Sequence, residues 1–167
     1  MAKTLFKGQS VQLAGEFISL DAVAPAFELT KSNLTSYALK EARGKNVVLN
    51  IFPSLDTGIC ATSVRKFNQL AGQLPNTLVL AISKDLPFAQ GRFCSVEGIG
   101  NVIALSDFRP SSFAKDYGVL MEDGPLRGLL ARAVVVINVD GKVIYTELVS
   151  EIGIEPNYDA VIELLKK

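Results

Sequence analysis

Residues Asn46–Phe52 form a nearly continuous apolar run that ends at Pro53. A run of this length without polar alternation is typical of a strand that is covered on both faces. From Gly58 onward the apolar residues recur at helical spacing instead. The helical stripe consists of Cys60, Val64, Phe67 and Ala71. A doubly covered strand followed by an amphipathic helix predicts a sheet with helices packed on its faces.

Further periodic segments extend this pattern in both directions along the chain. Strands are predicted at Thr4–Phe6, Ser10–Leu13, Phe27–Thr30, Thr77–Ile82, Val102–Leu105, Arg132–Asn138 and Lys142–Leu148, with a weaker fragment at Tyr37–Leu39. Helices are predicted at Leu86–Cys94, Ser111–Tyr117 and Pro156–Leu165. A βαβ half is followed by a ββα half, which is the thioredoxin-like arrangement. We therefore expect one α/β domain over residues 1–167, with a mixed central sheet flanked by helices and an N-terminal β-hairpin.

Composition and charge exclude several classes of function. Lys and Arg together number 17, as do Asp and Glu, and no basic stripe stands out, so no nucleic-acid partner is expected. Lys3, Lys7 and Glu16 interrupt the N-terminal region before a signal-peptide core can form, and the longest apolar runs are only strand-sized. We therefore expect a cytoplasmic chain that does not enter a membrane. In such a reducing compartment a disulfide tends to be transient and catalytic.

The sequence contains no histidine and two cysteines, Cys60 and Cys94. Catalysis by a Ser-His-Asp or Cys-His arrangement is therefore excluded, and two thiols with carboxylates make a poor structural zinc site. Any chemistry must use cysteine, arginine, lysine, tyrosine, hydroxyl or carboxylate groups.

Cys60 lies where a helix is predicted to begin. If Thr57 is the N-cap residue, its hydroxyl faces the backbone N–H of the third helical residue, which is Cys60. The thiol then lies beside unpaired N–H groups and the positive end of the helix dipole, and both favour a thiolate. Pro53 ends the strand pairing and Gly58 lets backbone approach a ligand, so we expect a small apolar-walled pocket with the thiolate at its floor. At this point the alternative, a small buried hydrophobic residue at position 60, stays open.

Several blocks of sequence resemble one protein family. The spacing Pro53-x-x-x-Thr57-x-x-Cys60 has the form of the peroxiredoxin active-site motif. Four longer strings strongly resemble the bacterial thiol peroxidase branch, an atypical 2-Cys group with a thioredoxin-like fold. These strings are NIFPSLDTGICATSVRKFNQ, DLPFAQGRFC, DGPLRGLLARAVVVI and EPNYDA. The resemblance covers nearly the whole chain, with no departure at the motif positions.

The resemblance implies a thiol-specific peroxidase that reduces hydrogen peroxide and organic hydroperoxides in antioxidant defence. Cys60 matches the peroxidatic cysteine, whose thiolate attacks the peroxide and becomes a sulfenic acid. Thr57 matches the residue that hydrogen-bonds the thiolate and the peroxide, and Pro53 matches the residue that shields the sulfur from water.

The family's arginine near the reactive sulfur falls at Arg132, where a guanidinium stabilises the developing negative charge. Without the family, a charge at the mouth of an apolar strand is most often a solvated strand end. Arg127 and Arg109 are weaker candidates for the same role.

Cys94 matches the family's resolving cysteine, which implies an intramolecular Cys60–Cys94 disulfide formed by condensation with the sulfenic acid. Gly91 weakens the helix that carries Cys94 by about 1 kcal/mol relative to alanine, which suits a movable partner. We expect local melting of Ser83–Gly98 and Thr57–Ala61 on oxidation, although a buried spacer remains the alternative role for Cys94. The resemblance further implies thioredoxin as the electron donor, a homodimer, and no flavin, haem or metal cofactor.

Two other functions compete with the peroxidase. A disulfide oxidoreductase of the thioredoxin type would have Cys-x-x-Cys at the helix start, but Thr57 takes the place of the first cysteine. A redox-inert binding module with two buried cysteines predicts that neither thiol reacts with peroxide at neutral pH.

Overall fold

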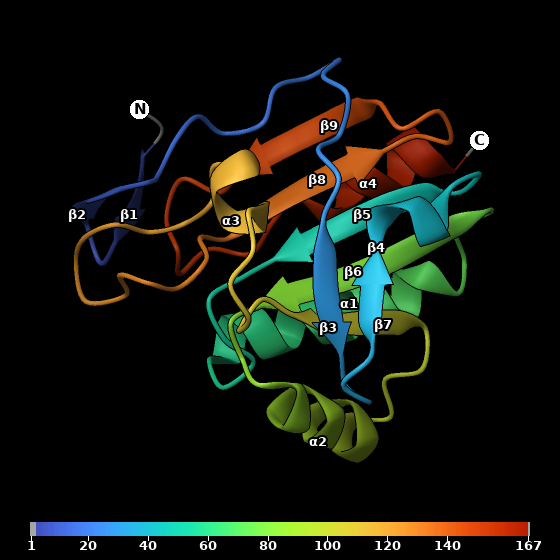
Figure 1. Cartoon of the computed structure of the whole chain (residues 1–167), viewed down its shortest axis with the longest axis horizontal. Coiled ribbons are helices and arrows are strands. Elements are labelled where there is room, and N and C mark those ends of the chain that lie inside the picture. The colour runs from blue at the N-terminus through green and yellow to red at the C-terminus, as the bar shows by residue number, and fades with distance from the viewer. Residues whose placement is uncertain (1–2, 167) are drawn as a thin grey trace.

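A computed structural model describes residues 3–166, so the predicted domain bounds of 1–167 extend beyond the described residues at both ends. Within the described residues, seven strands form one sheet in the order β4-β3-β7-β6-β5-β8-β9 (Figure 1). They are β3 (Glu28–Lys31), β4 (Ser36–Ala38), β5 (Asn46–Ile51), β6 (Thr77–Ser83), β7 (Val102–Ser106), β8 (Ala133–Ile137) and β9 (Val143–Leu148). The central strands β5, β6 and β7 run parallel, and the remaining neighbours pair antiparallel. The predicted thioredoxin-like α/β fold with a mixed sheet is confirmed.

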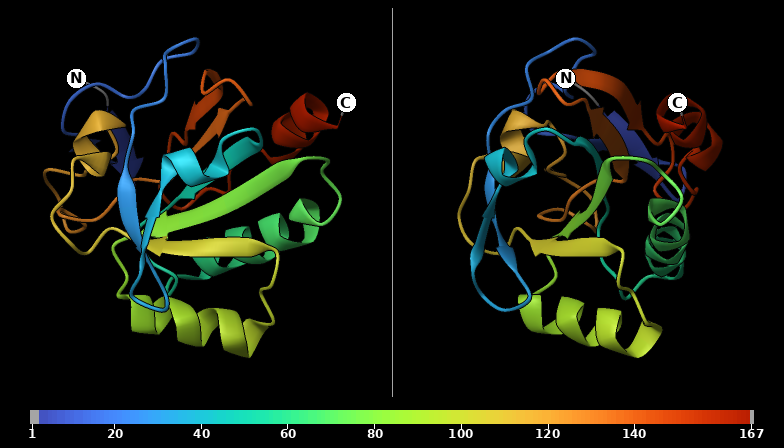
Figure 2. Two further views of the ribbon diagram at one scale, coloured as in Figure 1. Left: turned by 45° about the vertical axis from the view of Figure 1, so that its right-hand side comes forward. Right: turned by 90° about the vertical axis from the view of Figure 1, so that its right-hand side faces the viewer.

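Helices lie on both faces of this sheet. They are η1 (Leu39–Ala42), α1 (Gly58–Ala71), α2 (Pro87–Glu97), α3 (Phe113–Asp116) and α4 (Tyr158–Leu165). Helices α1 and α4 pack on one face, α3 lies on the other, and α2 lies beside β7 (Figure 2). Within residues 3–166, none of the helices combines the length and the apolar character that a membrane crossing needs.

The apolar run at Asn46–Phe52 becomes the doubly covered strand β5. Side chains of Val47, Leu49 and Ile51 join the core cluster beneath β3 and α3, whereas Val48 joins the cluster beneath α1 and α4. Successive residues of a strand point to opposite faces, so a strand with helices on both sides favours apolar residues on both faces; the one fully buried polar side chain of β5, Asn50, donates to the Ser63 hydroxyl at 3.3 Å. Burial of both faces explains why polar and apolar residues do not alternate in β5.

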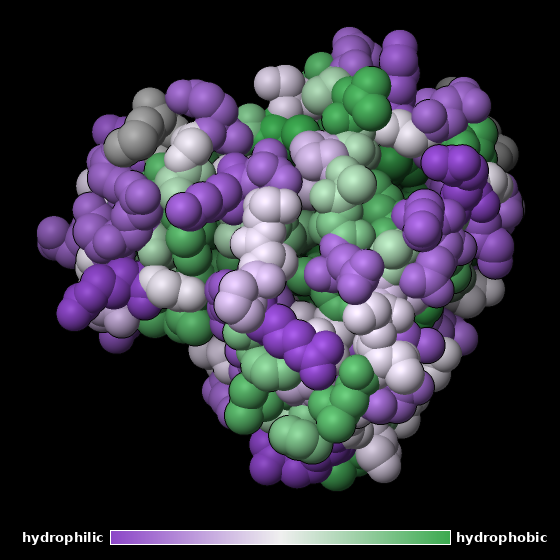
Figure 3. Space-filling view, in the orientation of Figure 1, coloured by the Kyte–Doolittle hydropathy of each residue, from purple (hydrophilic) through white to green (hydrophobic). Residues whose placement is uncertain are grey.

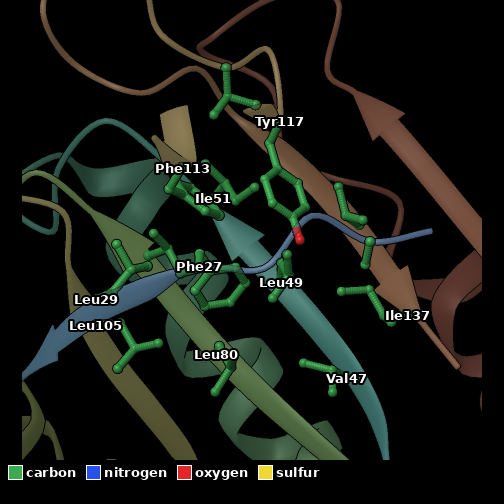
Figure 4. Close-up of a cluster of buried hydrophobic side chains, with 14 of the residues drawn as sticks. Phe27, Leu29, Val47, Leu49, Ile51, Leu80, Leu105, Phe113, Tyr117 and Ile137 are labelled. Carbon is green, nitrogen blue, oxygen red and sulfur yellow. The ribbon is translucent and has the colours of Figure 1, made fainter. Parts of the chain in front are cut away.

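Aromatic rings fill the cluster beneath β3 and α3 (Figure 4). The ring of Phe27 meets that of Phe113 edge-on, with centroids 5.1 Å apart, and Tyr117 stacks on Phe113 at 4.8 Å. The Tyr117 hydroxyl donates a hydrogen bond to the carbonyl oxygen of Pro25 at 2.7 Å, which satisfies the one polar group of this aromatic set.

The N-terminal hairpin is also confirmed, as β1 (Lys3–Phe6) and β2 (Gln9–Gln12). Its two turn residues, Lys7 and Gly8, both have positive φ, at 49° and 80°, as a tight type I′ turn requires.

The helix bounds differ most from the predictions in α2 and α3. Helix α2 continues past Cys94 to Glu97 and ends at Gly98, whose φ of 68° gives a left-handed C-terminal cap. Cys94 therefore lies inside the last turn rather than at the helix end. Helix α3 is shorter than the predicted Ser111–Tyr117.

Candidate active site

The motif residues gather at the edge of the sheet where the parallel strands end. Strands β5, β6 and β7 finish at this edge, and the loops that follow them lie side by side because parallel strands share a direction. Arg132 immediately precedes β8, whose first residue, Ala133, pairs with Ile51 at the end of β5. The sheet thus brings Arg132 to the same edge as the turn that leads from β5 into α1.

Cys60 is the third residue of α1 and is fully buried. It packs in a cluster with Phe52, Leu55 and Val64, and its thiol is free. With 0% of the residue exposed, the expected small apolar-walled pocket with the sulfur at its floor is not formed in this structure. Close packing by the neighbouring apolar side chains is the physical reason.

Thr57 is the N-cap residue of α1, as predicted, but its hydroxyl does not reach the Cys60 N–H. The Thr57 hydroxyl instead donates to the Ser54 carbonyl oxygen at 3.0 Å, and the Thr57 backbone N–H donates to the same oxygen at 3.2 Å. The predicted hydrogen bond between the Thr57 hydroxyl and the Cys60 N–H is therefore wrong, because the hydroxyl is engaged in the tight turn that precedes the helix. The first helical turn is left without a capping side chain, and its N–H groups remain available to an anion.

Arg132 is buried beside the sulfur, with only 2% of its surface exposed. Its Nη2 donates to Cys60 Sγ at 3.2 Å and its Nε donates to the Ile152 carbonyl oxygen at 2.8 Å. Its Nη1 has no hydrogen-bond partner among the described residues. A solvated strand end is thereby excluded for Arg132.

The guanidinium of Arg132 has an acidic group within hydrogen-bond distance, the thiol of Cys60. Within residues 3–166, no ion pair joins a carboxylate to this guanidinium. An uncompensated buried charge costs several kcal/mol, and the group that lies within reach to balance it is the sulfur of Cys60. A guanidinium and a helix N-terminus both attract negative charge, so the arrangement can hold an anion at this position.

Pro53 is buried at the start of the turn that positions Thr57. The turn is held by Asp85, a residue that the sequence analysis missed. Asp85 follows β6, and its carboxylate accepts hydrogen bonds from the Ser54 hydroxyl at 2.7 Å and from the Leu55 backbone N–H at 2.8 Å. The available signal was its position two residues after the end of a buried parallel strand, because such residues reach the same sheet edge as the turn after the neighbouring strand.

Cys94 is half-buried in α2 and its thiol is also free, so the two cysteines are not linked in this structure. Burial raises the pKa of the Cys94 thiol above its ordinary value, which keeps it protonated at neutral pH. The preceding residue, Phe93, packs against the cluster that contains Cys60, and Arg65 of α1 pairs with Glu97 of α2. Helix α2 is thus docked on α1 with its thiol apart from the Cys60 sulfur.

Comparisons with known proteins agree on one family. The model of the Redoxin family matches residues 20–162. A thiol peroxidase from Corynebacterium glutamicum is 53% identical over 165 residues, which is 99% of each chain. A thiol peroxidase from Mycobacterium bovis shows the same identity over the same share of both chains.

Solved structures agree as well. A peroxiredoxin-like protein from Aquifex aeolicus superposes with a TM-score of 0.94 at 40% identity, covering 99% of this chain and 96% of the other. A thiol peroxidase from Chromobacterium violaceum superposes with a TM-score of 0.91 over the same shares, and at 22% identity this likeness concerns the fold alone.

Proposed function

Because this chain belongs to the Redoxin family, as a thiol peroxidase of the peroxiredoxin type, we propose that Cys60 is its peroxidatic residue. The observation that carries the proposal is the 3.2 Å contact between Arg132 Nη2 and Cys60 Sγ at a buried helix N-terminus. A thiolate is the reactive form of cysteine, and both surroundings favour that form.

In the first step the side chains packed over the buried Cys60 sulfur move to admit a hydroperoxide, and the Cys60 thiolate attacks its terminal oxygen. An S–O bond forms and the O–O bond breaks, and the leaving alkoxide takes a proton to become an alcohol, or water when the substrate is hydrogen peroxide. Cys60 is oxidised to a sulfenic acid and the peroxide is reduced by two electrons. We include both hydrogen peroxide and organic hydroperoxides as substrates.

Arg132 and Thr57 stabilise this step from two sides. The Arg132 guanidinium stabilises the negative charge on the sulfur and, as the O–O bond breaks, the negative charge that develops on the oxygen. The Thr57 hydroxyl proton is held by the Ser54 carbonyl oxygen, which leaves the hydroxyl oxygen as an acceptor for the O–H of the peroxide. Pro53, buried at the start of the same turn, keeps water from the sulfur.

In the second step the Cys94 thiol condenses with the sulfenic acid. An S–S bond joins Cys60 to Cys94 and one water leaves, so the oxidation level of the protein is unchanged. Because Cys94 is docked in α2, segments Ser83–Gly98 and Thr57–Ala61 open locally to bring the two sulfurs together. Thioredoxin then reduces the disulfide by thiol exchange and restores both thiols.

We also propose a cytoplasmic homodimer. Apolar side chains that are exposed on and beside α2, those of Leu86, Phe88 and Val96, supply surface that a second copy can cover. Hydrophobic surface is visible at the lower end of Figure 3, where α2 lies. Light scattering that gives the mass of one chain at micromolar concentration would contradict the dimer.

Titration of free thiols before and after one equivalent of hydroperoxide tests the catalytic proposal. The reduced protein is expected to lose both thiols and to gain one disulfide per chain. Cys60→Ser is expected to lose no thiol, whereas Cys94→Ser is expected to form a sulfenic acid that dimedone traps at position 60. A wild-type protein that keeps both thiols would favour the redox-inert module, and normal turnover by Cys60→Ser would refute the assignment.

A further inference from the structure

The carboxylate of Asp85 joins the two segments that carry the cysteines. Its Oδ1 accepts from the Ser54 hydroxyl, and its Oδ2 accepts from both the Leu55 N–H and the Ser83 hydroxyl, the last at 2.8 Å. Three donors thus converge on one half-buried carboxylate. Hydrogen bonds to a charged acceptor are stronger than neutral ones, so this carboxylate fixes the geometry of its neighbours.

One arm of this network runs to the catalytic turn. Ser54 is bound to Asp85 through its hydroxyl, and its carbonyl oxygen holds both the N–H and the hydroxyl of Thr57. The Ser54 hydroxyl also accepts the Asp56 N–H at 3.1 Å. The position of Thr57 at the start of α1 therefore depends on the position of Asp85.

The other arm runs to the helix that carries Cys94. Ser83 accepts a hydrogen bond from the Gln90 side chain at 3.2 Å, and the same Gln90 amide donates to the Leu105 carbonyl oxygen at 2.9 Å. Gln90 is fully buried in α2, one helical turn before Cys94 and on the same face. The buried glutamine anchors α2 to the ends of β6 and β7.

We propose that Asp85 is a positioning residue for both steps of the peroxidase cycle, an inference that rests on the proposed function. Through Ser54 it holds Thr57 where peroxide reduction needs it. Through Ser83 and Gln90 it keeps α2 docked and so delays the approach of Cys94. One carboxylate thereby favours the first step and restrains the second.

The test measures the two steps separately by rapid quench, alkylation and mass spectrometry of the reduced protein mixed with hydrogen peroxide. In Asp85→Asn the negative charge is lost; the amide oxygen keeps the Leu55 N–H and the Ser83 hydroxyl, and the NH₂ group replaces Oδ1, the acceptor of the Ser54 hydroxyl. We expect Cys60 oxidation to slow about tenfold, because misplaced catalytic donors lose transition-state stabilisation. We expect disulfide formation to accelerate about fivefold, because α2 opens more readily.

Two further variants separate the arms. Ser54→Ala is expected to slow only the oxidation of Cys60, and Gln90→Leu is expected to accelerate only disulfide formation. Asp123→Asn is the matched control, since the Asp123 carboxylate also accepts a backbone N–H, that of Gln12, near the N-terminal hairpin. It is expected to leave both rates unchanged.

A merely structural role for Asp85 predicts that all destabilised variants change both rates in the same direction. That outcome, or wild-type rates in Ser54→Ala and Gln90→Leu, would overturn the inference, and both variants remain informative if Asp85→Asn does not fold. Failure of the proposed function is distinguishable, because the wild-type protein itself would then leave Cys60 unoxidised.

Discussion

Gly91 offers a direct way to slow the second step without touching either sulfur. It lies inside α2, where glycine destabilises a helix by about 0.8–1.0 kcal/mol relative to alanine. A Cβ built at Gly91 would find its nearest neighbour, the Ser32 Cβ, at 3.4 Å, which is an ordinary van der Waals contact. Gly91→Ala therefore fits the docked helix and stabilises it.

If the disulfide forms from the locally opened state, its rate follows the population of that state. A stabilisation of about 0.8–1.0 kcal/mol lowers this population roughly fourfold to fivefold at room temperature. We expect Gly91→Ala to slow disulfide formation by that factor and to leave Cys60 oxidation unchanged. Rapid quench of the reduced protein with one equivalent of peroxide, followed by peptide mass spectrometry, measures both rates.

Gly98→Ala is the control, since we expect it to change the rate of disulfide formation in the opposite direction. Gly98 has a φ of 68° with no other atom within 4 Å of a built Cβ, so alanine there strains only the backbone of the helix cap. Left-handed backbone costs an L-residue about 1–2 kcal/mol, so disulfide formation should accelerate at least fivefold. Equal rates in wild type, Gly91→Ala and Gly98→Ala would refute local opening of α2 as the step that limits disulfide formation.

Burial raises the pKa of all four tyrosines, and burial together with the neighbouring Glu147 charge raises that of Tyr145 to about 12. Since these folded-state values exceed the unfolded value near 10, the free energy of unfolding should hold below about pH 10 and fall as the pH rises toward 12. Absorbance of tyrosinate near 295 nm in native and denatured protein checks this, and superimposed titration curves would contradict it. Phe67 is fully buried and its ring meets Tyr158 at 5.2 Å, so Phe67→Ala should cost about 3–5 kcal/mol in urea unfolding. Val23→Ala, at a residue 77% exposed and away from the proposed dimer surface, should change the free energy of unfolding by less than about 0.5 kcal/mol, and equal losses in the two variants would show that burial is misassigned.

Most of the fold follows from local sequence pattern. The nearly continuous apolar run of Asn46–Phe52 and the stripe that begins at Cys60 identify β5 and α1, because burial on both faces of a strand and burial on one face of a helix leave different periodicities. The turn at Lys7 and Gly8 identifies the hairpin. In α2 the periodicity is weak and the left-handed cap at Gly98 decides where the helix ends, so its last turn was missed.

The candidate site was only partly predictable for a different reason. Pro53, Thr57 and Cys60 belong to one local motif, but the partners of that motif come from distant segments. Asp85 lies 30 residues from Leu55, and Arg132 lies 72 residues from Cys60, so only the sheet topology brings them together. Local capping rules also could not show that the Thr57 hydroxyl donates its hydrogen bond to the Ser54 carbonyl oxygen in the preceding turn.

The proposed catalysis depends on an ion pair between the buried guanidinium of Arg132 and the sulfur of Cys60. The most direct test is the thiolate absorbance near 240 nm at neutral pH in a Cys94→Ser background, which leaves Cys60 as the single thiol. With Arg132 present, we expect about one thiolate per chain, and in Arg132→Gln we expect that absorbance to fall to a small fraction. Equal absorbance in the two proteins, or none with Arg132 in place, would contradict the ion pair.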